Sequence, residues 1–554
     1  MTDVGALLQQ ALALHQQGRL READKLYARV LKAAPDNFDA LHLSGLAKAQ
    51  AGQMGDAYRL IAAALKINNR APDAHVNFAN VLHALKREGE ALAALERALA
   101  LKPGDVDILR LRGNALLSLN RAEEALESFD AALKVNPRQP EALANRGTAL
   151  AALGRAEEAL RDFDAALTLA PHHPGALYNR GNALFDLGRP ALALEAYDRA
   201  LARAPNHAQA LNNRGRALQA LNRHQEAAES FGKAIALNPD YADAHSNRAL
   251  SLLTLGDLAR GFAEYEWRWK RSGMTDTRRN YRGRLWLGEY PLARKTILLT
   301  AEQGLGDSIQ FARYAPMLAR AGARVLLEVQ GELKPLMASL AGVAELYGRG
   351  EKLPPYDVYC PLGSLPLAMA TEASNIPADI PYLAADEVRL ARWRPLLEGL
   401  PGKRVAFAWA GHARHPNDRN RSIDLALWAP LLARDDISFV SIQRDLRHDD
   451  AVRLAGYGNV THLGDKLDDM ADTAAVIALA DLTIAVDTSV AHVAGALGRP
   501  LWVLLPFSPD WRWALSAEHT PWYPQARLLR QPALGDWPSV LAQAGAALDE
   551  FAAV

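Results

Sequence analysis

The sequence predicts a chain of two parts, an all-α solenoid of paired helices followed by an α/β region with two parallel sheets. Residues in about the first half recur with a 34-residue period, which is typical of stacked helical units. From Lys295 onward, short β-branched runs alternate with helical stretches, as in parallel sheets. The length of 554 residues also fits several domains.

Composition narrows the class of protein. The 63 Lys and Arg balance the 63 Asp and Glu, so no global charge attracts nucleic acid or acidic membranes. One cysteine, Cys360, excludes a disulfide framework and a metal site built on several thiolates. The chain begins with no signal-peptide pattern and has no apolar run long enough to span a bilayer. We therefore expect a cytoplasmic protein with no membrane span, no nucleic-acid partner and no bound metal.

The period has three marked positions. Proline recurs where a second helix would end, a small residue recurs where two helices would touch, and a bulky residue follows sixteen positions later. These positions hold Pro35, Pro103, Pro137, Pro171, Pro205 and Pro239; Gly45, Ala79, Gly113, Gly147, Gly181, Gly215 and Ala249; and Ile61, Leu95, Phe129, Phe163, Tyr197, Phe231 and Tyr265. We expect the bulky residue to fill the next unit. The pattern resembles the tetratricopeptide repeat and covers residues 1–272, about seven to eight repeats.

Asparagine and arginine also recur on the first helices of the repeats. Asparagine occupies one register at Asn77, Asn145, Asn179, Asn213 and Asn247, and arginine occupies the next at Arg112, Arg146, Arg180, Arg214 and Arg248. An asparagine ladder can hold an extended peptide backbone, because each amide both donates and accepts. It is similar to the ladder inside O-GlcNAc transferase, which implies a protein acceptor in the superhelix. The alternative is a structural consensus in which arginine stems pack over neighbouring helices.

The period fades into a stretch rich in aromatics and arginine, and we assign residues 273–294 to a capping linker. Trp267, Trp269 and Trp286 are expected to close the end of the solenoid, since terminal repeats need an atypical cap. Stacking on nucleic acid is the alternative interpretation.

The second half is predicted to form two lobes, residues 295–395 and 402–535, with a closing helix at 536–554. The expected strands are listed in chain order: Thr296–Thr300, Arg324–Val329, Asp357–Tyr359, Arg404–Trp409, Ile437–Gln443, Leu482–Val486 and Leu501–Leu505. Residues 506–530 are expected to be rich in loops. Ligands of such sheets bind at the carboxyl ends of the strands, so we expect a cleft between the lobes.

The turn after the first strand contains Gly304, Gly306 and Asp307. It resembles a dinucleotide-binding turn, but Ile309 replaces the third glycine and the Asp307 carboxylate would repel a pyrophosphate. Asp307 suits a general base that accepts a proton from an acceptor hydroxyl. It would equally suit a helix cap, and the residues alone leave both interpretations open.

Two segments of the second lobe suit anion binding. The loop after one strand holds His412, Arg414, His415, Arg419 and Arg421 within ten residues, although a solvated basic loop is the alternative. A second strand runs into Asp487-Thr488-Ser489 at a helix start, where backbone N–H groups can bind a phosphate. His492 lies one turn into that helix and either donates to the same anion or makes a core contact.

The segments EQGLGDSIQFARYAP, NDRNRS and DTSVAHVAGALGRP resemble motifs of the ADP-heptose:lipopolysaccharide heptosyltransferases, glycosyltransferase family 9, over residues 295–535. The resemblance implies a GT-B fold with two Rossmann-like lobes and inverting transfer without a metal. It implies Asp307 as the base and an acceptor-side loop of Gln303, Gly304, Gly306 and Gln310. The implied donor-binding residues are Trp409, Gly411, His412, Asn417, Arg419, Arg421, Ser422, Gln443, Asp487, Thr488, Ser489 and His492. Arg421 and Ser422 replace the family's lysine loop, and Ser489 replaces a glycine.

The whole plan resembles protein glycosyltransferases, including those that modify flagellin. The first hypothesis is therefore transfer of a sugar from a nucleotide-sugar, used as co-substrate with no cofactor, to a protein hydroxyl. The second is transfer to an envelope glycan or lipopolysaccharide, and the third is a non-catalytic scaffold.

Overall fold

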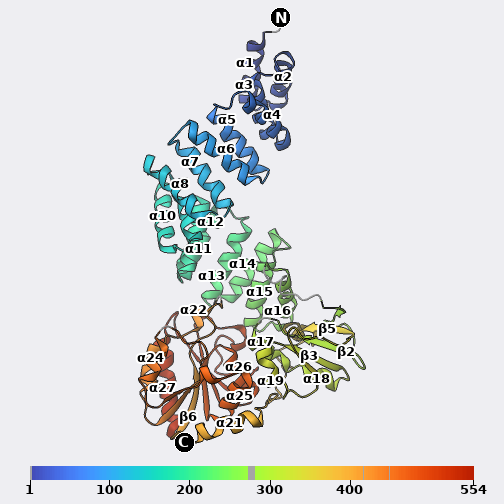
Figure 1. The fold of residues 1–554 in the computed structure, drawn as a ribbon, viewed down its shortest axis with the longest axis vertical. Helices are drawn as coiled ribbons and strands as arrows, with labels where there is room; N and C mark the ends of the chain where they lie inside the picture. Colours follow the sequence, from blue (N-terminus) through green and yellow to red (C-terminus); the bar gives the residue numbers. More distant parts are fainter. Residues whose placement is uncertain (1–2, 273–280, 303, 416, 448, 554) are drawn as a thin grey trace. The chain divides into compact units, whose positions relative to one another are not determined.

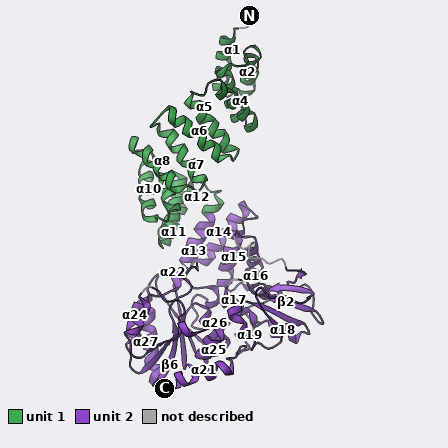
Figure 2. Cartoon of the chain, viewed as in Figure 1, with its two compact units in different colours: residues 1–210 green, residues 211–554 purple. Residues whose placement is uncertain are grey.

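The computed structural model describes residues 3–272, 281–302, 304–415, 417–447 and 449–553. The chain divides into two compact units, residues 1–210 and residues 211–554, with the boundary inside helix α13 (Figure 2). Of the predicted capping linker, residues 273–280 lie outside the described residues, as does the predicted site residue Gln303.

Helices α1 to α16 occupy residues 4–265 and run in antiparallel pairs (Figure 1). Their bounds are α1 Val4–Gln16, α2 Leu20–Ala33, α3 Phe38–Gln50, α4 Met54–Ile67, α5 Pro72–Ala84, α6 Glu88–Leu101, α7 Val106–Ser118, α8 Ala122–Val135, α9 Pro140–Ala152, α10 Ala156–Leu169, α11 Pro174–Asp186, α12 Pro190–Arg203, α13 Ala208–Ala220, α14 His224–Leu237, α15 Ala242–Thr254 and α16 Leu258–Tyr265. A 3₁₀ helix, η1 (Glu266–Lys270), follows. The predicted helical repeats are confirmed.

The glycine register exists because each glycine touches the bulky residue of its own pair. A Cβ atom on Gly113 of α7 would lie 2.5 Å from the Phe129 ring of α8, and the same closeness recurs at Gly45, Gly147, Gly181 and Gly215. Each bulky residue thus meets the small residue of its own pair, and the expectation that it also fills the next unit stays a prediction. A small residue at this position lets the two helices of one repeat approach closely.

The arginine register makes contacts both within a repeat and between neighbouring repeats. Arg146 on α9 donates two hydrogen bonds of 2.7 Å to Asp162 on α10, sixteen residues later, and at the same spacing Arg112 donates to Ser128 at 2.5 Å and Arg248 to Glu264 at 2.9 Å. In the other direction, Arg146 donates to Asp130 of α8 at 2.8 Å and Arg180 of α11 donates to Asp164 of α10 at 2.6 Å. The register therefore has a structural function.

The first sheet is parallel throughout, in the order β1-β5-β2-β3-β4. Its strands are β1 Arg284–Leu285, β2 Thr296–Thr300, β3 Arg324–Val329, β4 Val343–Gly348 and β5 Val358–Pro361. Helices α17 (Leu305–Ala312), α18 (Ala315–Arg320), α19 (Lys334–Met337) and α20 (Leu365–Ala368) belong to this lobe.

The second sheet is parallel in the order β11-β10-β9-β6-β7-β8. Its strands are β6 Lys403–Ala408, β7 Ile437–Ser441, β8 Val460–His462, β9 Leu482–Val486, β10 Leu501–Leu505 and β11 Ala526–Arg530. Its helices are α21 Glu387–Glu398, which precedes β6, α22 Asp418–Arg421, α23 Ala429–Leu432, α24 Asp450–Ala455, α25 Met470–Leu479, α26 Ser489–Ala496 and α27 Trp537–Ala553. Taken in chain order, the strands follow the doubly wound arrangement 3-2-1-4-5-6. An all-α repeat region followed by two parallel sheets confirms the predicted fold class and is consistent with two GT-B-like lobes.

Four strands match their predicted bounds residue for residue, and three others differ by one or two residues at an end. Residues 506–525 are largely irregular, as expected of a loop-rich segment, but Ala526–Arg530 form β11, which pairs with β10 at the edge of the second sheet. The sequence analysis also missed β1, β4 and β8. Each of these missed strands lies at a sheet edge, where one side lacks a neighbour and apolar patterning is weaker.

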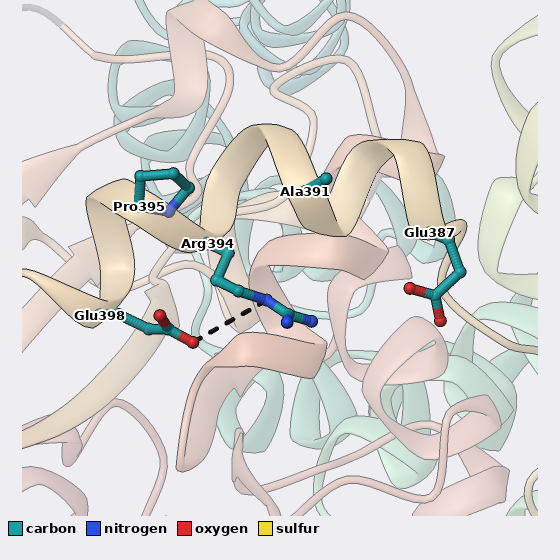
Figure 3. A pocket seen from close by; sticks show the side chains of 5 residues that line it. All are labelled: Glu387, Ala391, Arg394, Pro395 and Glu398. Atoms are coloured by element: carbon teal, nitrogen blue, oxygen red, sulfur yellow. Dashed lines mark ion pairs between the residues drawn. The ribbon is translucent and has the colours of Figure 1, made fainter.

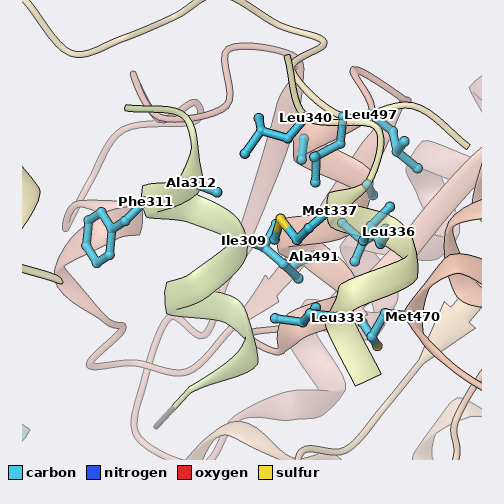
Figure 4. Close-up of a cluster of buried hydrophobic side chains, with 14 of the residues drawn as sticks. Ile309, Phe311, Ala312, Leu333, Leu336, Met337, Leu340, Met470, Ala491 and Leu497 are labelled. Atoms are coloured by element: carbon cyan, nitrogen blue, oxygen red, sulfur yellow. The ribbon is translucent and has the colours of Figure 1, made fainter. Parts of the chain in front are cut away.

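One continuous apolar core joins the last repeats to both lobes of residues 211–554. It contains Phe262 of α16, the inner face of the first sheet, and Ala491 and Val493 of α26. Figure 4 shows side chains of α17, α19, α25 and α26 gathered in this core, among them Ile309, Met337, Met470 and Ala491. The last repeat therefore shares its packing with the sheets.

The glycine register yields a matched test. Gly113→Ala should lower the free energy of unfolding by about 1–3 kcal/mol, because the new methyl group meets the Phe129 ring. Gly89→Ala, in α6 with nothing within 4 Å of a Cβ atom, should stabilise by about 0.5–1 kcal/mol. Denaturant unfolding followed by circular dichroism measures both, and equal effects would contradict the helix-contact explanation.

Candidate functional site

The candidate site lies where the chain reverses direction in the second sheet, between β6 and β9. In doubly wound sheets a crevice opens at the carboxyl ends of the two strands beside this reversal. Trp409 and Gly411 follow β6 there, and Asp487 and Thr488 follow β9. The sheet order thus brings together two segments about 75 residues apart that the sequence had marked as anion-binding.

The first lobe contributes Asp307 in the first turn of α17, whose N-cap is Gly304. Asp307 is therefore not the N-cap residue of its helix. Its Oδ1 accepts a 2.5 Å hydrogen bond from Nη2 of Arg512, a residue of the second lobe in the 3₁₀ helix η7 (Trp511–Trp513). Arg512 also donates to Oδ1 of Asp510 at 2.8 Å and to Oε1 of Gln310. One buried guanidinium thus connects the two lobes at the candidate base.

The surroundings of Asp307 favour its protonated form. Burial raises the pKa of Asp307 above its usual value, and the charges of Asp510 and Glu302 add to this, while Arg512 opposes it. The side chain still exposes 41% of its surface, so solvent-sized groups reach it. A carboxylate of raised pKa that remains accessible is suited to general base catalysis.

The loop after β6 is organised around Arg421. Its Nη1 donates to the backbone carbonyl of Asp487 at 2.9 Å, which ties the basic loop to the end of β9. A Cβ atom on Gly411 would lie 2.5 Å from the Arg421 guanidinium, so a larger residue there would displace this side chain. Ser422 accepts from the Gly411 N–H at 3.0 Å and donates to Asp418 at 2.7 Å. These contacts favour an ordered binding loop over a solvated one.

Helix α26 begins at Ser489 with Thr488 as its N-cap and contacts α17 through His492. A Cβ atom on Gly306 would lie 2.6 Å from Cδ2 of His492, so glycine allows the two helices to meet. The His492 Nδ1 lies 3.0 Å from the Tyr523 hydroxyl. Burial lowers the pKa of His492 well below its usual value, and Arg512 and Arg313 add to this, so the ring is neutral at pH 7.

Asp487 lies at the end of β9, where its backbone carbonyl accepts the hydrogen bond from Arg421. Burial raises the pKa of Asp487, as does the charge of Asp510, while Trp513, Arg421 and Arg512 oppose the shift. The charges of Asp510 and Arg512 therefore shift the pKa values of both Asp307 and Asp487.

Three polar atoms of this region are buried without a hydrogen-bond partner among the described residues. They are Nε2 of Gln310, Nε of Arg421 and Oγ1 of Thr488. Buried polar groups are nearly always paired, because leaving one unpaired costs free energy. Two donors and a hydroxyl in this position are suited to an oxygen-rich anion.

Not every residue marked by the sequence contributes a side chain to the crevice. Trp409 is fully buried, and its indole N–H donates to Asp450 at 3.2 Å, so it has no surface available to a ligand. Gln443 accepts from the Ala410 N–H at 3.0 Å and donates to the Asp445 carbonyl, and so ties the ends of β6 and β7 together. His412, Asn417 and Arg419 are exposed, and Ser489 is half-buried.

The sequence analysis missed Arg512, Asp510 and Arg313, all of which shape the site. Arg512 and Asp510 lie in the segment interpreted as loop, where the only signal was the triplet Trp511-Arg512-Trp513. Arg313 is buried and donates to the carbonyls of Gln310, Pro377 and Trp522 at 2.9–3.0 Å. These acceptors come from the first lobe, the segment between the lobes and the second lobe.

The last repeats contact both lobes. On the first lobe, Arg268 of η1 donates to Glu302 at 2.7 and 2.9 Å and to Ser364 at 2.8 Å. On the second lobe, Ser508 donates to the Gln219 carbonyl at 2.9 Å, and the Phe262 and Trp511 rings pack edge to face. Tyr265 of α16 lies close enough to Asp307 for that charge to raise its pKa, although burial is the larger cause.

The asparagine register makes contacts between neighbouring repeats. Asn145 donates to Asn114 at 2.8 Å, Asn179 to Thr148 at 3.1 Å and Asn247 to Asn212 at 3.0 Å. Asn77 lies 3.1 Å from His42, and Asn213 accepts from Asn212 at 3.1 Å. All five side chains are half-buried, so the register joins repeats and also reaches the surface.

One hollow of the surface lies away from these residues. A hollow on α21 is lined by Glu387, Ala391, Arg394, Pro395 and Glu398, and Figure 3 shows all five side chains coming from this one helix. Among the described residues, no group of three or more His, Cys, Asp or Glu side chains is placed to hold a metal ion. None of the described helices has the length and apolar character that crossing a membrane requires.

Comparisons with known proteins first define the class. The tetratricopeptide repeat family matches residues 110–174 and 213–276, and a second description of the same repeat matches residues 174–240. The family of anaphase-promoting complex, cyclosome, subunit 3 matches residues 16–98. The chain therefore contains tetratricopeptide repeats, followed by a C-terminal α/β region of two parallel sheets.

Particular relatives follow from the same comparisons. The chain is distantly homologous to Protein FlbA of Caulobacter vibrioides, with 28% identity over 325 residues, 54% of each protein. The chain thus spans about half the length of this curated relative. Among solved structures, a tetratricopeptide repeat protein of Parabacteroides merdae is 20% identical with a TM-score of 0.40, covering 46% of this chain and 100% of that one. YrrB, described as a repeat protein with an unusual peptide-binding site, is 26% identical with a TM-score of 0.28, covering 33% of this chain and 95% of that one.

Arg313 provides a test of how the lobes are joined. Arg313→Met should lower the free energy of unfolding by about 3–5 kcal/mol, because the buried carbonyls it serves lose their donor. The control is Arg320→Met, since the Arg320 side chain is 63% exposed and pairs with an exposed Asp379, and it should change stability by about 0.5 kcal/mol or less. Similar losses in the two variants, measured by thermal unfolding, would show that Arg313 does not join the lobes.

Proposed function

We propose that this protein is an inverting glycosyltransferase that needs no metal and transfers a sugar from a nucleotide-sugar to a Ser or Thr hydroxyl of a protein held by the repeats. The observation that carries the proposal is the pairing of two kinds of group across one crevice. The first lobe provides Asp307, an accessible carboxylate of raised pKa. The second lobe provides Arg421, Thr488 and the start of α26, which are suited to a diphosphate.

In this mechanism the donor diphosphate lies against the start of α26 and against Arg421. Asp307 accepts the proton of the acceptor hydroxyl while its oxygen forms a bond to the anomeric carbon of the sugar. The bond from that carbon to the phosphate oxygen breaks on the opposite face, so the configuration inverts. The nucleoside diphosphate leaves with the electron pair, and the cationic and N–H groups of the second lobe stabilise its charge.

The repeats would supply the acceptor. A solenoid holds an extended partner and thereby raises its local concentration at the catalytic crevice. The amides of the asparagine register are half-buried and are partly used by hydrogen bonds between repeats. Any amide donor or acceptor that these bonds leave available would contact the backbone of a bound peptide. The last repeat packs beside Asp307, so a segment leaving the solenoid there would be close to the base.

Asp307→Asn should lower the transfer rate by about 10²–10⁴-fold while leaving nucleotide-sugar binding intact, because the amide keeps the shape but cannot accept the proton. The wild-type rate should rise with pH through a limb above the ordinary aspartate range, since the base must be ionised and burial raises its pKa. Steady-state transfer assays and calorimetric binding measure the two properties.

The control for Asp307→Asn is Asp435→Asn, which changes an exposed carboxylate just before β7, at the opposite end of the strands, and should leave transfer unchanged. Unchanged turnover in Asp307→Asn would remove Asp307 from the mechanism.

Truncation separates a protein acceptor from an envelope glycan. A chain of residues 205–554 begins after α12 and keeps α13–α16, which pack with the lobes. It should bind and slowly hydrolyse the nucleotide-sugar like the full chain, but modify a protein acceptor at least tenfold more slowly. Transfer to a lipid-linked or polysaccharide acceptor at the full rate would instead support the envelope function.

A further inference from the structure

The strap that carries Arg512 contains an unusual backbone conformation. This strap, residues 510–520, crosses from the second lobe to Asp307 and includes η7. Ala514, which ends η7, has φ 56° and ψ −176°, a region that is populated almost only by glycine. A residue with a Cβ atom adopts this conformation only where its surroundings hold it.

Arg530, at the end of β11, provides such a hold. Its guanidinium donates to the carbonyl of Ala514 at 2.9 Å, to that of Ala517 at 2.8 Å, and to that of Trp513. Each of these acceptors is a neutral backbone carbonyl of the strap, and burial lowers the pKa of Arg530 to about 10. The strap is fixed at a second point by the Thr520 hydroxyl, which donates to the Arg512 carbonyl at 2.6 Å.

We infer that Arg530 is a positioning residue that holds the strained turn at Ala514 and so keeps Arg512 on Asp307. Arg530 does not touch Asp307 itself and acts on it only through the strap. Because Arg512 opposes the rise in the pKa of Asp307, the position of the strap sets the pH at which the base ionises. This inference deepens the proposed function and rests on it where transfer is concerned.

A change in the pKa of Asp307 reports on Arg512 only if the other groups that influence this pKa keep their positions. The charged or titratable groups that influence Asp307, or are influenced by it, are Arg512, Asp510, Glu302, Arg268, Tyr265 and His415. Arg530 instead donates to the backbone carbonyls of Trp513, Ala514 and Ala517, so substitution of Arg530 changes the arrangement of these groups by moving the strap.

The experiment compares full-length wild type, Arg530→Met, Ala514→Gly and the double variant by hydrogen exchange of residues 510–520. Arg530→Met should speed exchange of the strap at least tenfold and move the acid limb of kcat/KM to higher pH, because Arg512 leaves Asp307. Ala514→Gly adopts the turn without strain, so in that background the loss of Arg530 should speed exchange by less than threefold. Arg527→Met, an exposed arginine of the same strand, is the control and should behave as wild type.

Two results would overturn the inference. One is a rate of hydrogen exchange in the strap that does not change in Arg530→Met. The other is an Arg530→Met effect of the same size whether position 514 is Ala or Gly. If Arg530→Met does not fold, Arg530→Lys gives the same comparison, since a lysine cannot span three carbonyls in one plane. If wild type transfers no sugar from any nucleotide-sugar, the proposed function fails, while the exchange results still decide whether Arg530 holds the strap.

Discussion

The arrangement of residues 211–554 depends on a single apolar core that the last repeats and both lobes share. Two lobes with separate cores would be free to move as independent domains, since interfaces between domains are small and polar. Here Phe262 of the last repeat, Ile309 of the first lobe and Ala491 of the second lie in one cluster. This packing fixes α17 against α26, and the crevice between the sheets acquires a defined geometry for that reason. The second core, behind the other face of the second sheet, supports the strands that end in the crevice.

On this apolar base the polar groups of the crevice act as one network. Arg512 is shared among Asp307, Asp510 and Gln310, so a change at any of them alters the charge that the others experience. Burial makes these effects large, because the surroundings screen charges less than water does. The same burial keeps His492 neutral and raises the pKa values of Asp307 and Asp487. The network therefore places an accessible carboxylate, Asp307, beside a buried guanidinium that the other groups share.

Sequence patterns that arise within one or two structural elements were sufficient to predict much of the fold. The Gly113 and Phe129 pair recurs at a spacing of sixteen because one ring contacts one glycine within each repeat, and a contact of this kind leaves a period in the sequence. Buried central strands such as Leu482–Val486 were found because both faces are covered, which makes the whole run apolar. Edge strands such as Val343–Gly348 carry polar residues and gave no such signal. The Asp307 turn and the Asp487-Thr488 turn were recognisable because each follows a buried strand.

The sequence by itself determined the repeat, the change to parallel sheets and the two turns that end in the candidate site. Tertiary structure decided that Arg512 meets Asp307 across 205 residues, that Trp409 is buried in the core, and that the arginine register joins helices within and between repeats. The physical reason is the range of the interactions. Periodicity and turns reflect neighbours within one or two elements, whereas an ion pair between lobes follows from sheet order and shared packing. Arg530 and Ala514 illustrate the same limit, because a strained turn and the side chain that holds it are far from obvious until β11 is placed beside the strap.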